Sequence, residues 1–362
     1  MKKGAILLAI NDLGFGGGQR TVVEEANELS KRGIDVHVVT TLAGGAHSLA
    51  RYLSIRKDHI HHVSFRSLFD VAGYRSLVAL YKTIKPEVVV SNLFHTNTIT
   101  RSMKFCFPRV RVIVREGNIP KEKSIYVSII DTVLSLLTYR VISNAVYVQR
   151  ALKIQTLFAK KAVLYNGVSA QFFESNSEFD FKAARIREKI PLEAVIFFAA
   201  GSLVEKKGYR DLLTAFSRLS PHCHLIIVGE GYLRSELERF VPEHGLIGRV
   251  HFLGNISDMS HLYHLADVFV LTSHWEGVPN VVLEAMASAL PVVVTNVGGI
   301  SEVVDDGVEG YLVPSGDIRA ITSRLSELSH DEALRTRLGM NGRKRAHTFM
   351  WPAHVDRLLE LI

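Results

Sequence analysis

The hydrophobic and polar positions of this chain alternate in a way that predicts parallel β-sheets. Short apolar runs, rich in β-branched residues, are followed by amphipathic segments along the whole sequence. This order is typical of βαβ units, in which buried strands are joined by helices that cover the sheet. Helices are predicted over Gln19–Arg32 and Ala72–Lys85. In the first half of the chain the predicted strands are Ala5–Ile10, Val36–Thr40, Ile60–Val63, Val88–Ser91, Val110–Arg115, Val141–Ser143 and Ala162–Tyr165.

The same alternation starts again after a polar stretch without a clear strand, Ser175 to Lys189. The second set of predicted strands is Val195–Ala200, His224–Val228, Val250–Leu253, Val268–Leu271, Pro291–Thr295 and Gly310–Val313. Each is short, apolar and bounded by glycine or polar residues, as buried parallel strands are. The predicted fold class is α/β, with two doubly wound parallel sheets. Because such sheets bind ligands at the carboxyl ends of their strands, we expect the site in a cleft between two domains.

The length and the composition agree with a two-domain globular protein. A chain of 362 residues exceeds the length at which one hydrophobic core usually keeps growing. We place the domains at residues 1–170 and 171–344. Hydrophobic residues make up 47% of the chain and charged residues 22%, which is ordinary for a globular protein. The two cysteines, Cys106 and Cys223, lie far apart without metal-type spacing, which favours a reducing, cytoplasmic compartment.

The sequence predicts neither a secretory signal nor a membrane-spanning helix. Met1-Lys2-Lys3 leads into a short apolar run without the small-residue pattern of a cleavage site. The longest apolar stretch, Ile125 to Ile142, is interrupted by Asp131 and Arg140, whereas a spanning helix needs roughly 20 consecutive apolar residues. We therefore expect a protein that is soluble or bound peripherally to a membrane.

The net charge of +7 is distributed unevenly along the chain. Residues 1–165 contain 24 Lys and Arg against 11 Asp and Glu, and the remainder contains 19 against 25. A basic first half favours an anionic partner, namely nucleic acid, an acidic membrane surface or a phosphate-bearing acceptor, over a generally soluble surface. Nucleic acid is the least favoured of these, because the sequence has no zinc-finger spacing, RNP-like aromatic motif or isolated basic helix.

The first candidate for ligand binding is a glycine-rich loop directly after the first predicted strand. It contains Gly16, Gly17 and Gly18, and an amphipathic helix begins at once. Glycines in this place let backbone N–H groups approach an anion at a helix N-terminus. A dinucleotide-binding fold would add an acidic residue at the end of the second strand, but that strand ends in Thr40-Thr41. The loop therefore does not predict a dehydrogenase.

The second candidate is a segment with two lysines between glycines, again after a strand and before a helix. It reads Gly-Ser-Leu-Val-Glu-Lys-Lys-Gly over residues 201–208. A lysine held at the carboxyl end of a strand is well placed to neutralise a pyrophosphate. Taken alone, Lys206 and Lys207 could equally be two solvated charges in a loop.

The third candidate follows the strand Val268–Leu271 and reads His-Trp-Glu-Gly-Val-Pro-Asn-Val-Val-Leu-Glu over residues 274–284. Asn280 is the predicted N-cap of a helix, which puts Glu284 about one turn inside it. Both Glu276 and Glu284 then lie near one strand end, where one can meet a sugar and the other a ribose. A lone glutamate at a helix start is often only a dipole-stabilising residue, but the combined pattern is hard to explain structurally.

With these segments in order, the chain resembles the family 4 glycosyltransferases, which are retaining enzymes with the GT-B fold of two Rossmann-like domains. The resemblance covers nearly the whole length and is specific for the family rather than for a substrate. It rests on the glycine-rich first loop, Asn166-Gly167-Val168, residues 201–208, the pair Glu276 and Glu284, and Gly298-Gly299 before Glu302.

The resemblance implies a role for each of these positions. Gly16, Gly17 and Gly18 would lie against the donor phosphates and the acceptor. Lys207 would bind the diphosphate and Glu284 the ribose hydroxyls.

The donor sugar would be held by other residues of the same motifs. Glu276 would hold its hydroxyls, together with backbone N–H groups of the segment from Gly277 through Val278 and Pro279 to Asn280. His95 resembles the first-domain histidine that faces the donor sugar near the reacting carbon. The resemblance thus makes His95, Glu276 and Lys207 the catalytic residues. The closing segment, residues 345–362, is expected to pack back on the first domain.

One position departs from the family pattern. The family often has an arginine where this chain has Ser202, and that arginine shares the diphosphate charge with the lysine. Lys206, Arg115 or Arg20 are the candidates to replace it. Arg115, Glu116 and Asn118 also form a candidate loop for the acceptor.

We expect no metal and no cofactor, with the nucleotide sugar as a substrate. No Asp-x-Asp motif follows a strand, and a lysine with helix N-termini can stabilise a diphosphate leaving group. The run His59-Ile60-His61-His62 has a metal-like appearance but no evident carboxylate or cysteine partner, so we interpret it as structural or as part of the surface.

The predicted reaction is transfer of a sugar, with retention of configuration, from a UDP- or GDP-type donor to a hydroxyl of a glycan, lipid-linked or polysaccharide acceptor. Two alternatives stay open: a nucleotide-sugar binder without transferase activity, and a sugar-nucleotide epimerase. The apolar, lysine-flanked stretch from Lys121 to Leu137 is a candidate for peripheral contact with the inner face of an anionic membrane.

Overall fold

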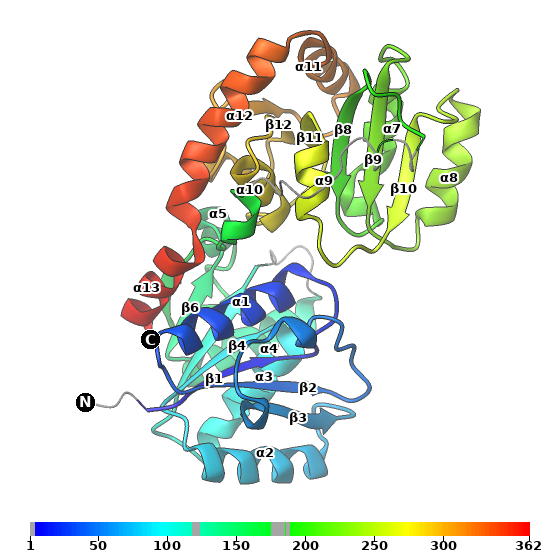
Figure 1. Ribbon diagram of the computed structural model, residues 1–362. Helices are drawn as coiled ribbons and strands as arrows, with labels where there is room; N and C mark the ends of the chain where they lie inside the picture. Colours follow the sequence, from blue (N-terminus) through cyan, green and yellow to red (C-terminus); the bar gives the residue numbers. More distant parts are fainter. Residues whose placement is uncertain (1–3, 118–123, 175–184, 186–188) are drawn as a thin grey trace. The chain divides into compact units, whose positions relative to one another are not determined.

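The computed structural model describes residues 4–117, 124–174, 185 and 189–362. The chain forms two compact units (Figure 1). Unit 1 comprises Met1–Gly167 together with Trp351–Ile362, and unit 2 comprises Val168–Met350. From the sequence, the first domain is predicted to end at residue 170 and the closing segment to start at residue 345.

The core of unit 1 is a seven-stranded parallel sheet with the order β3-β2-β1-β4-β5-β6-β7. Every strand predicted in the first half is present, with ends shifted by at most a few residues. The strands are β1 (Ile6–Ile10), β2 (Val36–Leu42), β3 (Ile60–Phe65), β4 (Val88–Asn92), β5 (Arg111–Glu116), β6 (Arg140–Ser143) and β7 (Lys160–Val163).

Helices cover both faces of this sheet (Figure 1). The two-residue period of a strand explains why both faces need cover. In β1, Leu8 packs in a cluster with residues of the first and last helices, whereas Leu7 packs on the other face in a cluster with Leu77 and Ile99. The helices are α1 (Gly17–Lys31), α2 (Val71–Ile84), α3 (Phe94–Ser102), α4 (Ile125–Leu134), α5 (Val146–Ala151) and α13 (Trp351–Leu361).

The C-terminal helix α13 belongs to unit 1 and lies beside α1 (Figure 1). A buried ion-pair network holds it there. Glu25 of α1 is fully buried and accepts from Arg115 of β5 at 2.5 Å and from His354 of α13 at 2.7 Å. Burial by itself would raise the pKa of Glu25, but the charges of Arg115 and His354 outweigh it and keep that pKa below its usual value.

Unit 2 has a six-stranded parallel sheet with the order β10-β9-β8-β11-β12-β13. All predicted strands are again present: β8 (Val195–Ala200), β9 (Cys223–Val228), β10 (Val250–Gly254), β11 (Val268–Leu271), β12 (Val292–Thr295) and β13 (Gly310–Val313). The helices are α7 (Tyr209–Phe216), α8 (Arg234–Glu243), α9 (Ser260–Leu265), α10 (Asn280–Ala287), α11 (Ile318–His330) and α12 (Glu332–Ala346).

The strand orders identify the place in each unit where a ligand is expected. In unit 1 the chain winds outward from β1 in one direction and from β4 in the other, and in unit 2 it does so from β8 and β11. Ligands of doubly wound sheets bind at such switch points, outside the carboxyl ends of the strands. The loops that follow β1, β4, β8 and β11 contain the residues singled out from the sequence.

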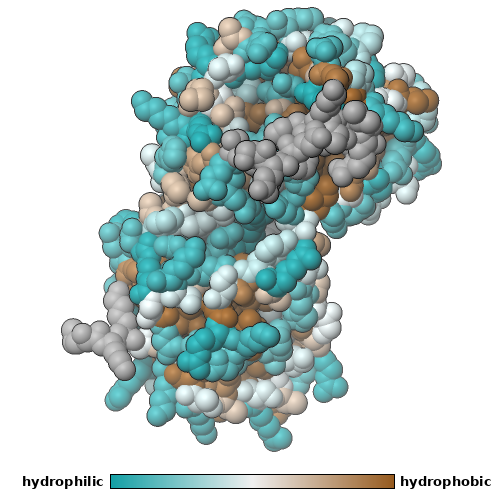
Figure 2. Space-filling view, viewed as in Figure 1, coloured by the Kyte–Doolittle hydropathy of each residue, from teal (hydrophilic) through white to brown (hydrophobic). Residues whose placement is uncertain are grey.

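Among the residues that the structure describes, no helix is both long enough and apolar enough to cross a bilayer. Hydrophilic residues cover much of the face seen in Figure 2, and hydrophobic residues reach it in separate patches.

Candidate active site

In unit 2, the loops after β8 and β11 pack directly against each other. β8 and β11 are hydrogen-bonded neighbours, so their carboxyl ends lie side by side. Thr272 donates its hydroxyl to the Gly208 carbonyl at 2.9 Å. Gly208 has φ +63°, and a Cβ there would lie 2.1 Å from the Thr272 carbonyl oxygen. Only glycine satisfies both conditions, which explains why the lysine segment ends in one.

This packing brings Lys207 and Glu276 together. The Lys207 ammonium lies 2.5 Å from Oε1 of Glu276, and the two side chains are only 13% and 9% exposed. Ser273 also donates to this oxygen, at 2.8 Å. An ammonium has three N–H donors, and the contact with Glu276 uses one of them. The Lys207 ammonium therefore keeps N–H donors for a further partner at the carboxyl end of the sheet.

The Gly298-Gly299 motif supports the turn that contains Glu276. Gly298 has φ +63°, and a Cβ there would lie 1.7 Å from the Glu276 carbonyl oxygen. The Gly299 N–H donates to the Gly277 carbonyl at 3.1 Å. The loop after β12 thus packs against the backbone of the turn that contains Glu276 and stabilises it.

The helix after this turn begins one residue earlier than the predicted cap implies. Asn280 is the first residue of α10 and Pro279 is the N-cap, with no side-chain cap hydrogen bond, so the predicted Asn280 cap is wrong. Pro279 takes the cap position because its extended backbone (φ −76°, ψ 132°) suits the non-helical residue that precedes a helix. Val278 is buried in the core, so its side chain is not accessible to a ligand.

Glu284 lies in the second turn of α10, close to the predicted place, and is 4% exposed. Its Oε2 accepts a hydrogen bond from the Tyr263 hydroxyl at 2.8 Å. Tyr263 is a residue of α9 and is fully buried, so its hydroxyl fixes the carboxylate in one orientation. No motif or spacing in the sequence singles out Tyr263.

The two other positions of the lysine loop are more open. Ser202, where the family often has arginine, is exposed. Lys206 is half-buried, and its carbonyl oxygen accepts from the His274 N–H at 2.7 Å. This backbone contact is a second connection between the loops after β8 and β11.

In unit 1, the glycine-rich loop after β1 leads directly into α1. Gly16 is the N-cap and Gly17 is the first helical residue. Gly16 and Gly17 are exposed and Gly18 is half-buried, and a Cβ at Gly18 would meet no atom within 4 Å. The first turn of α1 is thus open to close approach of a ligand to its backbone.

His95 is the second residue of α3, directly after β4. Leu93, the N-cap, has φ +70°, a backbone conformation that costs energy for a residue with a branched side chain. Within the described part of the chain, Nδ1 of His95 is buried without a hydrogen-bond partner. Burial also lowers the pKa of His95, which favours the neutral ring. A strained backbone and an unsatisfied ring nitrogen are features expected of a functional side chain.

A polar network that the sequence did not reveal positions the helix of His95. Asn11, after β1, accepts from the Thr96 hydroxyl at 2.6 Å, and Thr96 is 2.7 Å from the Thr41 hydroxyl of β2. Asn97 accepts from Ser91 of β4 at 2.8 Å. In the sequence, this network is indicated only by polar residues at the ends of buried strands.

The predicted acceptor residues have different surroundings. Arg115 is 9% exposed and is occupied by Glu25 and His354, which favours a structural role. Glu116 is also buried and accepts weakly from the Asn97 amide at 3.3 Å. Asn118 lies outside the described residues.

The interpretation of the histidine run as lacking a carboxylate is wrong. Asp35, just before β2, lies 3.7 Å from Nδ1 of His59. The sequence did not reveal this because the contact depends on β2 and β3 lying side by side.

Comparison with solved structures identifies the fold. The chain superposes on Anabaena HepE, solved in complex with UDP and glucose, with a TM-score of 0.87 at 20% identity and 98% coverage of both chains. It is similarly close to a sucrose-phosphate synthase from Thermosynechococcus elongatus, with a TM-score of 0.85 at 20% identity, covering 99% of this chain and 98% of the other. The fold is therefore that of the GT-B glycosyltransferases, as the resemblance implied.

Comparison of sequences gives the family. The profile described as Glycosyltransferase Family 4 matches residues 15–172, and that described as Glycosyl transferases group 1 matches residues 180–345. The chain belongs to this family of glycosyltransferases.

Two curated relatives span nearly the whole chain. The lipopolysaccharide core biosynthesis glycosyltransferase LpsE of Rhizobium meliloti is 26% identical over 96% of both chains. The UDP-Gal:alpha-D-GlcNAc-diphosphoundecaprenol alpha-1,3-galactosyltransferase of Escherichia coli is 24% identical over 95% of this chain and 93% of its own.

Proposed function

We propose that this glycosyltransferase moves a sugar from a nucleoside diphosphate, of the UDP or GDP type, to a hydroxyl of a lipid-linked or polysaccharide acceptor, with retention of anomeric configuration. The names of the relatives, which include lipopolysaccharide and diphosphoundecaprenol glycosyltransferases, support this class of acceptor. The UDP in the HepE complex supports a UDP-type donor.

One observation carries the proposal: Lys207 and Glu276 form a shielded ion pair at the carboxyl ends of β8 and β11, and Glu284 lies in the helix that follows the same turn. In the proposed complex the remaining N–H donors of Lys207 bind the diphosphate, and Glu284 accepts from the ribose hydroxyls. Glu276 accepts from hydroxyls of the sugar while Lys207 holds its carboxylate in place.

The departing diphosphate gains negative charge as the glycosidic bond breaks. A fixed ammonium and the N-terminal end of α10 stabilise charge that develops there, because neither needs to reorganise during the reaction. We therefore propose that transfer requires no metal ion. For His95 of unit 1 we propose the role that the resemblance implies, that of a neutral ring facing the donor sugar.

The experiment is a screen of UDP- and GDP-sugars with the purified full-length chain, with and without EDTA and with candidate lipid-linked acceptors. Mass spectrometry of the products separates the possible outcomes. An acceptor that gains one sugar residue supports transfer, and NMR of the new linkage reports retention or inversion. A changed sugar still attached to its nucleotide indicates an epimerase, and binding without any product indicates a binder.

We also propose that unit 1 docks on an anionic membrane through the outer face of α4. This helix is oriented with its aspartate inward: Asp131 is 1% exposed and pairs with the equally buried Arg101 of α3 at 2.7 Å. Its apolar residues therefore point outward, and Ile125, Tyr126 and Val133 are 67%, 75% and 59% exposed. Such an outward apolar face on a lone helix is typical of interfacial binding.

The surroundings of α4 supply the charge that an anionic membrane attracts. Phe158 donates its N–H to Ser135, which joins the end of α4 to a second segment where Ile154 and Leu157 are exposed. Exposed basic residues flank that segment, and the sequence has no Asp or Glu from residue 132 to residue 173. The flanking residues are Arg150, Lys153, Lys160 and Lys161.

Sedimentation with vesicles at low salt tests the docking surface. We expect binding to vesicles containing anionic lipid, little binding to neutral vesicles, and loss of binding in Ile129→Glu. Phe69→Glu is the matched control, because Phe69 is the most exposed large hydrophobic side chain of unit 1 and lies outside the α4 surface. Equal binding to both vesicle types, or equal loss in both variants, would contradict this proposal.

A further inference from the structure

A second cluster of ligating side chains lies at the amino ends of the unit 1 strands, away from the loops that contain Gly16 and His95. Asp35 directly precedes β2, His37 is the second residue of that strand, and His59 ends the turn that leads into β3. β2 and β3 are parallel neighbours, so these amino ends meet at one edge of the sheet. Ligands of the fold's own site bind at the carboxyl ends, so the catalytic chemistry does not account for this cluster.

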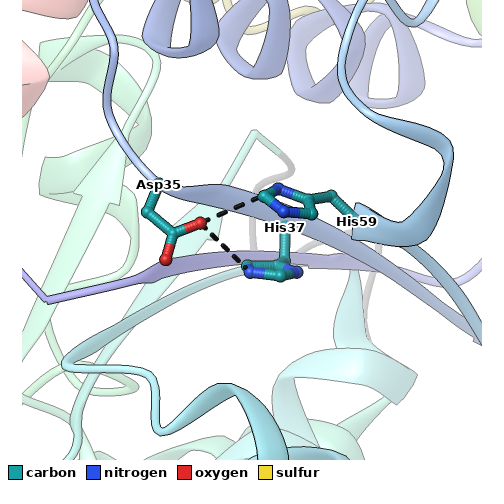
Figure 3. A group of neighbouring side chains, drawn as sticks. All are labelled: Asp35, His37 and His59. Carbon is teal, nitrogen blue, oxygen red and sulfur yellow. Dashed lines mark ion pairs between the residues drawn. The ribbon is translucent and has the colours of Figure 1, made fainter.

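The three side chains point toward a common place (Figure 3). Oδ1 of Asp35 lies 3.3 Å from Nε2 of His37 and 3.7 Å from Nδ1 of His59. One ligand atom from each side chain lies within 4.8 Å of the other two. Ligand atoms about 2.0–2.1 Å from a tetrahedral ion are about 3.3–3.4 Å apart, so the distance between Asp35 and His37 already fits coordination and the His59 ring has to move closer.

The neighbours of His37 are arranged as metal-binding histidines require. Nδ1 of His37 is 3.0 Å from Nε2 of His61. When His37 donates from Nδ1, its Nε2 lone pair faces the Asp35 carboxylate, and two electron-rich atoms at 3.3 Å are stabilised by a cation between them. The ring of His37 also stacks on that of His59 at 3.9 Å between centroids, and the His59 ring must tilt out of this stack for both to bind one ion, because an ion lies in the plane of each imidazole that binds it.

We propose that Asp35, His37 and His59 bind a divalent transition-metal ion, with Zn²⁺ as the best match and water as the fourth ligand. Two imidazoles and one carboxylate are a ligand set that Zn²⁺ accepts in tetrahedral geometry, and Mg²⁺ and Ca²⁺ prefer oxygen ligands throughout. Asp35 is exposed, so solvent reaches the fourth position.

Binding of the ion also breaks one hydrogen bond of His59. Nδ1 of His59 is 2.9 Å from the Val36 carbonyl, where its proton is hydrogen-bonded. Coordination through Nδ1 moves that proton to Nε2 and gives up this bond. The ion in return connects the start of β2 to the turn before β3, and β3 is an edge strand of the sheet. Its expected effect is to stabilise unit 1 rather than to take part in sugar transfer.

The test uses the full chain after treatment with EDTA, with ZnCl₂ as the titrant and MgCl₂ as the comparison. We expect one tight Zn²⁺ site per chain by calorimetry, a rise in the midpoint of thermal unfolding, and no effect of Mg²⁺. Co²⁺ should give the visible absorption of a tetrahedral complex. Asp35→Asn and His59→Gln should abolish the tight site, and His61→Gln should weaken it by about 10- to 100-fold through loss of the partner of His37.

A second histidine pair in the chain provides the matched control. His224 and His251 also face each other across neighbouring strands, at 3.2 Å between Nδ1 and Nε2, and no carboxylate completes a three-ligand group with them among the described residues. His251→Gln should therefore leave Zn²⁺ binding unchanged. The inference is overturned if Asp35→Asn and His59→Gln bind Zn²⁺ as tightly as the natural chain, or if His251→Gln removes the tight site. Nucleotide binding is measured separately and does not bear on either result.

Discussion

The replacement of Glu284 by glutamine tests the assignment of the ribose site with little disturbance of the fold. Glutamine keeps the size of the side chain and can still accept the hydrogen bond from the Tyr263 hydroxyl, now at its amide oxygen. It removes the negative charge and turns one acceptor atom into a donor. A ribose hydroxyl that had donated to the carboxylate then meets an N–H group.

The size of the effect follows from the burial of this side chain. Glu284 is 4% exposed, so water does not readily replace a lost contact there. A hydrogen bond to a charged group contributes about 1.5–3 kcal/mol, which corresponds to about a 10- to 150-fold weaker nucleotide affinity. Transfer should decline together with binding, because the same contact holds the donor during the reaction.

Calorimetry with UDP and GDP measures this affinity directly, and thermal unfolding of the same samples reports the stability of the variant. Tyr263→Phe serves as the comparison, because it keeps the carboxylate and removes the hydroxyl that orients it. We expect a smaller loss of affinity in Tyr263→Phe than in Glu284→Gln. An unchanged nucleotide affinity in a folded Glu284→Gln variant would refute the reasoning.

Three further predictions follow from the other buried charges. Lys207→Met should lower kcat/KM by about 10²- to 10³-fold, because it removes a fixed charge beside the leaving group, and Lys206→Met should have a smaller effect in the same steady-state assay. Glu25→Ala should lower the free energy of unfolding by about 3–5 kcal/mol in urea titrations, because it leaves Arg115 buried without its partner, whereas an unchanged midpoint would contradict the structural role of that pair. Burial and neighbouring positive charge lower the pKa of His224 to about 4 from 6.5, so the unfolded chain binds the proton first as the pH falls. The stability that neutral His224 contributes is complete above pH 6.5 and declines toward pH 4, by at most about 2 kcal/mol between pH 7 and 5. In His224→Leu the free energy of unfolding, measured in urea titrations, should therefore fall less steeply over this pH range.

The sequence predicts the sheets well because buried parallel strands leave a strong local signal. Val88–Val90 and Val268–Leu271 are continuous apolar runs, and such runs between amphipathic segments have few other interpretations. That Lys207 and Glu276 belong to one site is also predictable, since both residues follow strands and the resemblance assigns both to the donor. In these cases the information is contained in a short stretch of residues.

The remaining features depend on contacts between distant segments. Arg115 resembles a ligand-binding residue in sequence, but its partners Glu25 and His354 come from two helices that only the folded chain brings to β5. Asp35 and His59 are likewise joined only by the pairing of β2 with β3. No periodicity or motif reports such contacts, because each partner is an ordinary polar residue in its own segment.

The central claim is that Lys207, Glu276 and Glu284 of unit 2 form one site for a nucleoside diphosphate. A crystal structure of the full chain grown with UDP or GDP tests it most directly. We expect the diphosphate at hydrogen-bonding distance, about 2.7–3.2 Å, from the Lys207 ammonium, with the ribose hydroxyls on the Glu284 carboxylate. A nucleotide bound elsewhere on the chain, with neither of these residues in contact with it, would contradict the account.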